Sequence, residues 1–433
     1  MKRILIYSHD TFGLGNIRRM LSIAKHLVSE HKDYSVLLLS GSPMLHAFRI
    51  PQQLDYIKLP CLQRDELGMY GVRSLGIDMT DTLKLRSNLI RSTVEDYQPD
   101  IVMIDKKPLG ICAELEPALD YLKKRRNPPG VILLLRDILD SPEVTRKIWQ
   151  KRGYFDAIEN YYDRILVVGQ PEIFDIASEY DFPSAAAEKI EYCGYIRRES
   201  GLKNREEILT ELGLNDRQKL LLITPGGGKD GTHLVTNYLK AIKTVSSQHF
   251  HSLVLCGPEM MEACQELVNT QARGCNGITI RNFTDDLMSY MNAADGVISM
   301  FGYNTMCEIL TLQKPAIVIP RVRPVKEQWI RAMRMTEMGI VKAIHPDQLN
   351  TKNLKRAVNA LLSKQYSVPS GKTIKLDGLP NIKRFITAYM QEISQRKSIR
   401  VKSCTTAQGL HQADLSEQTE SMAEVAIEHF SRD

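Results

Sequence analysis

The segment over residues 296–328 limits the fold of this chain more than any other stretch. It begins with an apolar run at 297–300, continues through a helical pattern at about 303–313, and ends with a second apolar run at 316–319. Short apolar runs on either side of a helix predict a βαβ unit, whose two strands belong to one parallel sheet. Such sheets bind ligands at the carboxyl ends of their strands, where helix N-termini attract anions.

The helix of this unit carries polar side chains in its first turns. Asn304, Thr305 and Glu308 would face the carboxyl end of the sheet, where a phosphate or a sugar would lie. Thr305 and Glu308 also have the spacing of a capping box, which stabilises a helix N-terminus and needs no ligand. Spacing alone favours the capping box, so the functional interpretation depends on the rest of the chain.

The alternation of apolar runs and helical patterns recurs along the whole chain and divides it into two halves. In the first half, helical patterns such as 78–97 and 111–126 separate the apolar runs, and after a polar stretch at 194–204 the alternation restarts. We therefore predict an α/β fold with two tandem Rossmann-like, doubly wound domains and a cleft between them. The predicted parts are an N-terminal domain at 1–195, a C-terminal domain at 196–378, a helix at 379–396 that packs back on the N-terminal domain, and a flexible polar tail at 397–433.

Composition and charge exclude several classes of protein. A chain of 433 residues is too long for one hydrophobic core, and its formal net charge of +6 is too mild to argue for nucleic acid as a partner. The eight cysteines contain no CxxC pair, which is typical of reduced thiols in the cytoplasm. Because no stretch approaches the roughly 18 apolar residues of a membrane span, we expect a cytoplasmic protein. Peripheral contact with the inner face of the plasma membrane stays open.

A glycine-rich turn follows the first predicted strand of the second half. Gly226, Gly227 and Gly228 precede a helix, so the backbone can approach a diphosphate closely while N–H groups of the helix remain free. The next strand ends in Cys256 rather than in an acid, which argues against NAD. Lys229 is followed by Asp rather than by Ser or Thr, which excludes a P-loop. A tight turn without a ligand is the structural alternative.

A second glycine turn, at Gly13, Gly15 and Asn16, follows the first predicted strand of the chain. Arg18 and Arg19 come directly after it, in the first turn of a helix, where positive charge opposes the helix dipole. An anionic group that docks nearby would explain these two arginines. A solvated basic face is nearly as good an explanation.

Other polar residues of the first half follow the ends of predicted strands. His9, Asp10, Asp105 and Arg136 would line one side of a cleft between the halves, opposite the glycine turn and polar helix of the second half. His9 and Asp10 are the candidates for a catalytic base, although a histidine after a strand is more often structural. The chain has no DxD triplet and no metal-ligand spacing, so we expect neither a metal nor a cofactor.

Together these motifs resemble the GT-B glycosyltransferases, which have two Rossmann-like domains. The C-terminal half resembles glycosyltransferase family 28, the family of the peptidoglycan N-acetylglucosaminyltransferase. The resemblance lies in the run SMFGYNTMCE at 299–308, in Pro315 and Pro320, and in the pair Glu327 and Gln328. An uncharacterised bacterial branch of predicted glycosyltransferases is similar in its SHDTFGLG-type turn and its PRVxPxxEQ-type segment.

The resemblance implies a role for each matching residue. Glu308 would accept hydrogen bonds from the ribose hydroxyls of a nucleoside-diphosphate sugar, and Gln328, with Glu327, would contact the donor sugar. In the first domain, Gly13 and Gly15 would face the diphosphate or the acceptor. The other donor-site residues are Gly226, Gly227, Gly228 and Thr305 around the diphosphate, Phe283 and Thr284 in the loop that holds the base, and Gly302 and Asn304 at the start of the helix.

Three positions depart from the family pattern. Asn16 stands where the first turn typically carries a His, and Gly228 replaces a common Ser. Arg331 stands where the peptidoglycan enzymes carry Asn, so their sugar and acceptor should not be assumed for this chain.

From these residues and this resemblance we predict a hexosyltransferase. It would move a hexosyl or N-acetylhexosaminyl group from a UDP-linked donor to a small-molecule or lipid-linked acceptor, with inversion and without a metal. One alternative is a nucleotide-sugar 2-epimerase of the same fold. Another is a non-catalytic subunit that binds nucleotide sugars, an interpretation that the Asn16 substitution keeps open.

Overall fold

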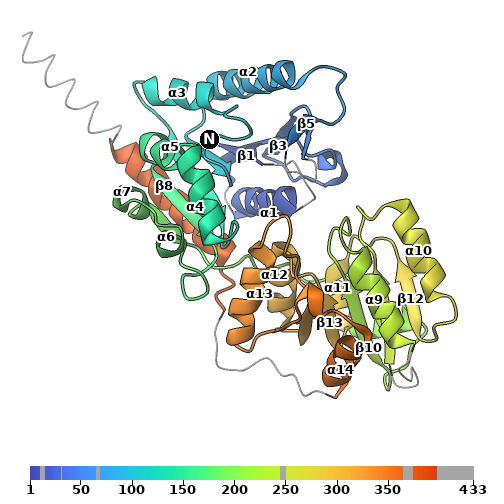
Figure 1. Ribbon diagram of the computed structural model, residues 1–433. Helices are drawn as coiled ribbons and strands as arrows, with labels where there is room; N and C mark the ends of the chain where they lie inside the picture. The colour runs from blue at the N-terminus through green and yellow to red at the C-terminus, as the bar shows by residue number, and fades with distance from the viewer. Residues whose placement is uncertain (10–14, 31, 65–68, 244–249, 364–373, 397–433) are drawn as a thin grey trace, which may run out of the picture.

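The structure, a computed structural model, describes residues 1–9, 15–30, 32–64, 69–243, 250–363 and 374–396. Within these residues the chain forms two separate parallel sheets with helices packed around them (Figure 1). This arrangement confirms the predicted α/β fold with two Rossmann-like domains in tandem. No helix of the described part is long and apolar enough to cross a membrane.

The N-terminal sheet has the strand order β3-β2-β1-β6-β7-β8-β9, and all of its pairs are parallel. Its strands are β1 Lys2–Ser8, β2 Tyr34–Ser40, β3 Leu54–Lys58, β6 Ile101–Asp105, β7 Gly130–Arg136, β8 Arg164–Val168 and β9 Ile190–Tyr192. Residues 4–8 of β1 are buried on both faces, as helices on each side of a parallel sheet require. Figure 1 shows the strands between α2 and α3 on one side and α1 on the other.

The longest helix of this domain, α2, begins at a side-chain cap. Asp78 caps α2, because its side chain accepts a hydrogen bond from the backbone N–H of Asp81. A small antiparallel hairpin of β4 Leu62–Arg64 and β5 Tyr70–Val72 stands apart from the main sheet. The helices are α1 Gly15–Glu30, α2 Met79–Tyr97, α3 Glu116–Lys124, α4 Pro142–Lys151, α5 Tyr154–Tyr161, α6 Ile176–Glu179 and α7 Ser184–Ala187, with a 3-10 turn at η1 Leu45–Ala47.

The helix expected over residues 111–126 starts five residues late. Cys112 and Ala113 adopt left-handed backbone conformations, with φ of 49° and 64°, so the first part of this segment is not helical. The next residue explains the detour, because the carboxylate of Glu114 is buried against Arg86 and the hydroxyl of Tyr7, each at 2.5 Å. A buried polar cluster therefore overrides the local helical pattern.

The C-terminal sheet has the order β12-β11-β10-β13-β14-β15 and is also parallel. Its strands are β10 Lys219–Thr224, β11 Phe250–Leu255, β12 Ile278–Arg281, β13 Gly296–Ser299, β14 Ala316–Val318 and β15 Lys342–Ala343. Its helices are α8 Arg205–Glu211, α9 Thr232–Ile242, α10 Glu262–Ala272, α11 Leu287–Ala293, α12 Tyr303–Leu312, α13 Glu327–Glu337 and α14 Thr351–Leu362, with η2 Pro346–Gln348. The unit β13-α12-β14 is the βαβ unit predicted at 296–328.

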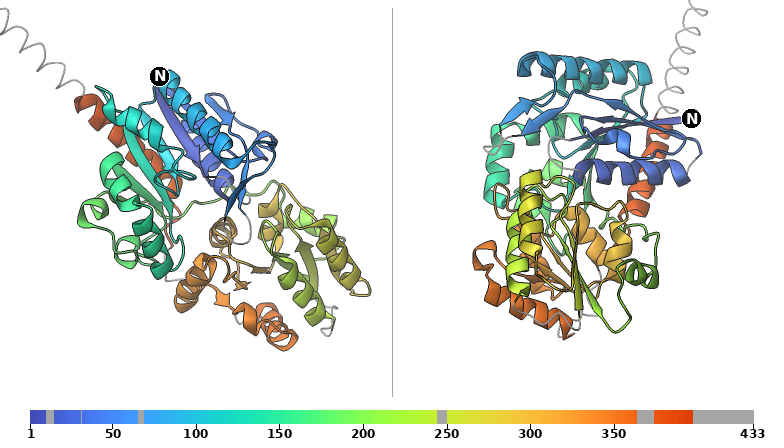
Figure 2. Two further views of the ribbon diagram at one scale, coloured as in Figure 1. Left: turned by 45° about the horizontal axis from the view of Figure 1, so that its top comes forward. Right: turned by 90° about the vertical axis from the view of Figure 1, so that its right-hand side faces the viewer.

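The chain returns to the N-terminal domain at its described end. A helix over residues 378–396 follows a backbone hydrogen bond from Gly378 N–H to the carbonyl of Tyr195, at 2.9 Å. This helix lies so close to the start of β7 that a Cβ at Gly130 would be 2.3 Å from the ring of Tyr389. Figure 2 shows the helix beside the N-terminal sheet.

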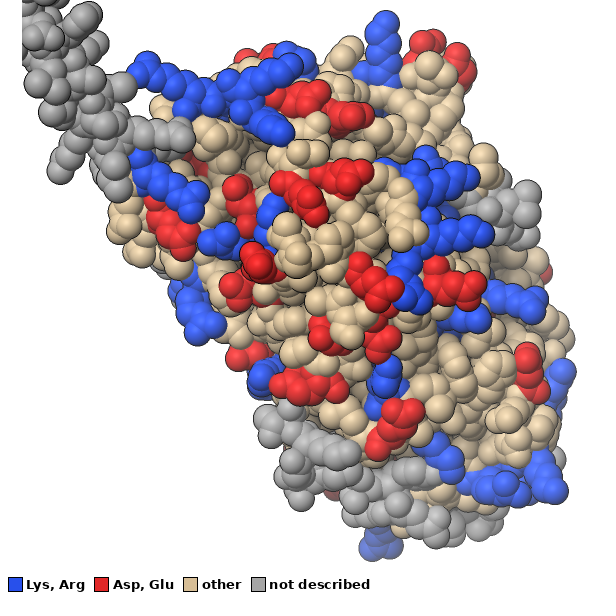
Figure 3. All heavy atoms as spheres, turned by 60° about the vertical axis from the view of Figure 1, so that its left-hand side comes forward, with Lys and Arg blue, Asp and Glu red and all other residues tan. Residues whose placement is uncertain are grey.

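Charge is mixed over the surface. On the face shown in Figure 3, basic and acidic side chains are interspersed over both domains. This pattern agrees with the modest net charge of +6.

Candidate active site between the domains

The starts of α1 and α12 meet where the two domains face each other. The side-chain amide of Asn304 donates a hydrogen bond to the carbonyl of Gly15, at 3.2 Å. One turn further along each helix, Arg18 Nη2 lies 3.1 Å from Glu308 Oε1. The hydroxyl of Tyr303 donates to the carbonyl of Val168 at the end of β8, at 2.9 Å. The carboxyl ends of strands from both sheets therefore meet at this junction of the domains.

The glycine turn after β10 lies against the start of α12. A Cβ at Gly226 would lie 3.5 Å from Thr305 Oγ1, and one at Gly228 would lie 2.3 Å from the carbonyl of Cys256, so this backbone admits only glycine at 228. On the other side of the same turn of α12, a Cβ at Gly302 would lie 3.7 Å from Gln328 Nε2. The structure thus brings the predicted diphosphate residues and Gln328 together.

Glu308 lies at the junction of the domains and is 1% exposed. Its Oε1 accepts from Arg18, whose side chain is 40% exposed. Its Oε2 is buried and has no hydrogen-bond partner among the described residues. A buried carboxylate oxygen without a donor is unfavourable, so this atom is suited to accept from a ligand.

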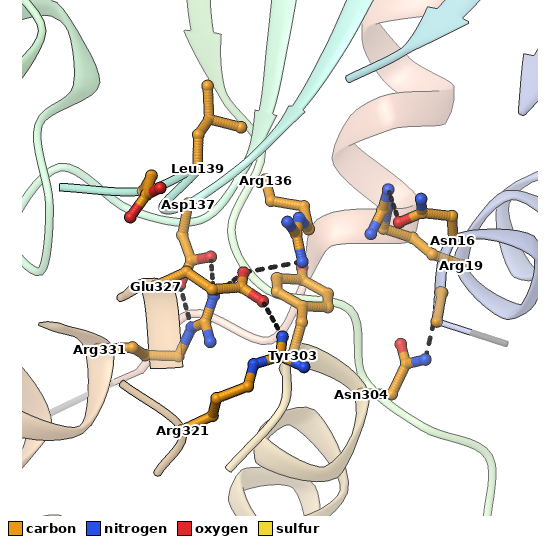
Figure 4. Close-up of polar contacts among 12 residues, drawn as sticks. Asn16, Arg19, Arg136, Asp137, Leu139, Tyr303, Asn304, Arg321, Glu327 and Arg331 are labelled. Atoms are coloured by element: carbon orange, nitrogen blue, oxygen red, sulfur yellow. Dashed lines mark hydrogen bonds and ion pairs between the residues drawn. The ribbon is translucent and has the colours of Figure 1, made fainter. Parts of the chain in front are cut away.

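Glu327, at the start of α13, accepts from arginines of both domains (Figure 4). Its carboxylate lies 2.8 Å from Arg136, 3.5 Å from Arg331 and 3.9 Å from Arg321. Burial alone would raise the pKa of Glu327, but these arginines outweigh it and lower the pKa to about 2. The side chain is ionised at neutral pH and is directed at cations rather than at an open pocket.

Arg331 joins the two domains through a fully buried ion pair. Its Nε and Nη2 lie 2.7 and 2.8 Å from the two carboxylate oxygens of Asp137, which follows β7. The ring of Tyr303 lies between Arg331 and Arg19, at 5.8 and 5.7 Å from the guanidinium carbons (Figure 4). The sequence shows that Arg331 departs from the family pattern. It does not show that Asp137 is the partner of Arg331, because 194 residues separate the two.

Arg19 and Asn16 fix the first turn of α1. Arg19 Nη2 lies 2.5 Å from Asp105 Oδ1, and both side chains are about 1% exposed. The amide of Asn16 donates to the carbonyl of His9 at 2.5 Å and accepts from Arg19 at 3.3 Å. Arg18 and Arg19 therefore already have carboxylate partners, and these pairs explain both arginines without a docked anion.

His9 directly follows β1, accepts at its carbonyl from the side chain of Asn16, and is 1% exposed. Its Nδ1 is buried without a hydrogen-bond partner among the described residues. Burial lowers the pKa of His9 well below its ordinary value of 6.5, and Lys106 and Lys107 lower it further. The imidazole is therefore neutral at neutral pH and has a ring nitrogen able to take a proton.

Comparison with protein families gives a match over the second domain. Residues 221–382 match the model of the "Glycosyltransferase family 28 C-terminal domain". A relative of similar length, the UDP-N-acetylglucosamine--N-acetylmuramyl-(pentapeptide) pyrophosphoryl-undecaprenol N-acetylglucosamine transferase of Alkaliphilus metalliredigens, is 22% identical over 407 residues. That alignment covers 92% of this chain and 100% of the relative. Several other relatives align with this chain over only about half of their own length.

Solved structures share the fold of the whole chain. The crystal structure of MurG from Acinetobacter baumannii superposes with a TM-score of 0.58 and 14% identity, covering 90% of this chain and 100% of that one. A putative UDP-N-acetylglucosamine 2-epimerase from Listeria monocytogenes gives a TM-score of 0.60 at 14% identity, covering 90% and 98%. The chain is a GT-B glycosyltransferase.

Some predicted site residues of this glycosyltransferase lie away from the cluster or cannot be placed. Asp10 and Gly13 lie outside the described residues. Phe283 is 57% exposed on the loop after β12, and the hydroxyl of Thr284 accepts from the backbone N–H of Asp286, at 3.1 Å. Among the described residues, no three His, Cys, Asp or Glu side chains are grouped so as to hold a metal ion.

Proposed function

We propose that this glycosyltransferase moves a hexosyl group from a UDP-linked sugar to an acceptor hydroxyl, with inversion at the anomeric carbon. The observation that carries the proposal is the buried Oε2 of Glu308, which lacks a donor beside the glycine turn and Thr305. Ribose hydroxyls supply such donors. Arg18 pairs with the other oxygen of Glu308, and its exposed side chain must move aside when the nucleoside enters.

The diphosphate would lie between two helix N-termini. The backbone turn at Gly226, Gly227 and Gly228 leads into α9, and Gly302 leads into α12 with Thr305 in its first turn. Both helix ends present backbone N–H groups and the positive end of a helix dipole, which together favour a bound phosphate. Gln328, next to Gly302, would then face the donor sugar.

His9 would act as the base of the transfer. The acceptor oxygen forms a bond to the anomeric carbon while its proton passes to the neutral imidazole of His9. The bond from that carbon to the diphosphate breaks, and its electron pair leaves with the nucleoside diphosphate. Attack from the side opposite the leaving group inverts the anomeric centre.

The acceptor would lie on the N-terminal side of the cleft. Large apolar side chains are exposed within one segment of this domain, at Met69, Leu75, Ile77 and Leu85. Exposed apolar groups of this kind favour contact with a lipid surface, which supports a lipid-linked acceptor and peripheral membrane contact. The Alkaliphilus relative is named for a lipid-linked acceptor of this type.

A thermal-shift panel with UDP, GDP and dTDP tests the donor assignment. We expect UDP to raise the melting temperature of the full chain, because a ligand that binds only the folded state stabilises it by mass action. An unchanged melting temperature with all three nucleotides would contradict the proposal. The match of residues 221–382 to a glycosyltransferase domain favours transfer over epimerisation. Release of a 2-epimeric sugar without any acceptor would reverse that preference.

A further inference from the structure

The cations around Glu327 do not all have the same surroundings. Arg331 is 0% exposed and binds both oxygens of Asp137, so its charge is neutralised by a carboxylate of the protein. Arg136, at the end of β7, is 11% exposed, and its Nη1 lies 2.8 Å from Glu327 Oε2. Its Nε is buried and has no hydrogen-bond acceptor among the described residues. Arg136 therefore has an N–H group available to hydrogen-bond a ligand between the domains.

Arg321 places this group next to the diphosphate turn. Its backbone N–H donates to Gln328 Oε1 at 2.9 Å, and its Nη1 lies 3.2 Å from Asp230, which directly follows Lys229 and the glycine turn. The same guanidinium is 3.9 Å from Glu327. A short chain of contacts thus runs from Arg136 of the N-terminal domain through Glu327 and Arg321 to Asp230, beside the glycine turn. Figure 4 shows its first part, from Arg136 to Arg321.

Lys106 adds a cation at the neighbouring strand end. It follows β6, which pairs with β7, and its backbone N–H donates to the carbonyl of Leu134 at 2.9 Å. Its φ of 72° is left-handed, a conformation that is unfavourable for a residue other than glycine and that clusters at functional sites. The described residues supply no ion pair to its ammonium group. Burial, followed by the charge of Arg136, lowers the pKa of Lys106 to about 7.

The charges of this group do not balance. Arg136, Arg321 and Arg331 are matched in number by the carboxylates of Glu327, Asp137 and Asp230. Lys106, with a pKa of about 7, adds a partial positive charge at neutral pH. Like charges at close range repel one another, so an anion bound at the cleft would relieve the excess. The nearest proposed anion is the diphosphate of the donor.

We propose that Arg136 and Lys106, both from the N-terminal domain, contact the diphosphate of the donor, and that Glu327 is the positioning residue that holds Arg136 there. The inference rests on the donor site proposed above. When the bond to the anomeric carbon breaks, its electron pair goes to the diphosphate, and these cations stabilise the growing charge. Glu327 would then hold the arginines in place. The family resemblance had predicted instead that Glu327 contacts the donor sugar.

Titration of the full chain with UDP and with uridine tests this inference. In Arg136→Ala and in Lys106→Met, we expect weaker binding of UDP and unchanged binding of uridine, since only UDP carries the diphosphate. The turnover number should fall by about 10²–10³-fold, more than the UDP affinity, because the charge grows in the transition state. Glu327→Gln should change both quantities in the same direction, and Arg136→Lys should recover part of the loss.

Arg334→Ala is the matched control. Arg334 also lies on α13 and pairs with Glu179 of the N-terminal domain at 2.7 Å, but both side chains are partly exposed. This variant loses an ion pair between the domains and should keep the UDP affinity and turnover of the unaltered protein.

The outcomes separate this inference from the donor assignment. Unaltered protein that fails to bind UDP would overturn both. If it binds UDP, and Lys106→Met and Arg136→Ala bind UDP and turn over equally well, the inference alone is wrong. Because Lys106 has no ion pair to lose among the described residues, its variant keeps the test decisive even if Arg136→Ala does not fold.

Discussion

Replacement of His9 by Ala is expected to lower the rate of sugar transfer by about 10²–10⁴-fold while leaving the affinity for UDP nearly unchanged. The imidazole follows β1 in the N-terminal domain, whereas the proposed nucleotide contacts come from α12 and the glycine turn of the C-terminal domain. Loss of the imidazole should therefore slow proton transfer without weakening the binding of the donor. Steady-state kinetics together with a UDP titration of the same variant measure the two effects.

The pH dependence of the rate gives a second readout for His9. Burial and the nearby lysines Lys106 and Lys107 lower the pKa of His9, so the neutral, basic form persists below pH 6.5. We expect kcat/KM to stay constant as the pH falls to about 6.5, the ordinary pKa of histidine, and to decline only at lower pH. Parallel loss of transfer and of UDP affinity in His9→Ala would show instead that His9 supports the structure of the cleft.

Replacement of Asp137 by Ala should destabilise the protein by about 3–5 kcal/mol, because Arg331 would remain buried without its two short hydrogen bonds. Its remaining carboxylate contact, to Glu327, is longer at 3.5 Å, and Glu327 also pairs with Arg136. Arg331 is 0% exposed and contacts Asp137 through two short hydrogen bonds, so water does not reach it in the folded protein. Urea-induced unfolding of the variant and of the unaltered protein measures the difference.

A double variant tests whether the unpaired charge is the cause. Arg331→Met combined with Asp137→Ala removes both charges, and we expect it to recover much of the lost stability. A double variant as unstable as Asp137→Ala alone would mean that packing at the domain interface, rather than charge, determines the effect.

Local features of the cleft could be predicted from the sequence. The unit over residues 296–328 folds as the periodicity indicates, and α12 ends at Leu312 because Gln313 takes a left-handed conformation before Lys314 and Pro315. The glycine turn could also be predicted, since a strand followed by three glycines and a helix leaves few alternatives. Each of these features depends on residues close together in the chain.

The contacts between the domains could not be predicted in this way. Arg18 and Glu308 are 290 residues apart, and Arg331 and Asp137 are 194 apart, so no spacing pattern relates the partners. The roles of Arg19 and Asn16 depend on Asp105 and on the backbone of His9, which only the folded chain brings together. The sequence shows that Asn16 and Arg331 depart from the family pattern, and the structure shows which neighbours they have.

Isothermal titration with UDP and 2′,3′-dideoxy-UDP tests most directly whether Glu308 binds the ribose of the donor. We predict that the unaltered chain binds UDP about 10- to 100-fold more tightly than the dideoxy form, as expected for hydrogen bonds to a buried carboxylate. Glu308→Ala should bind both nucleotides equally weakly. Equal affinity of the unaltered chain for the two nucleotides, or no binding of either, would contradict the proposed donor site.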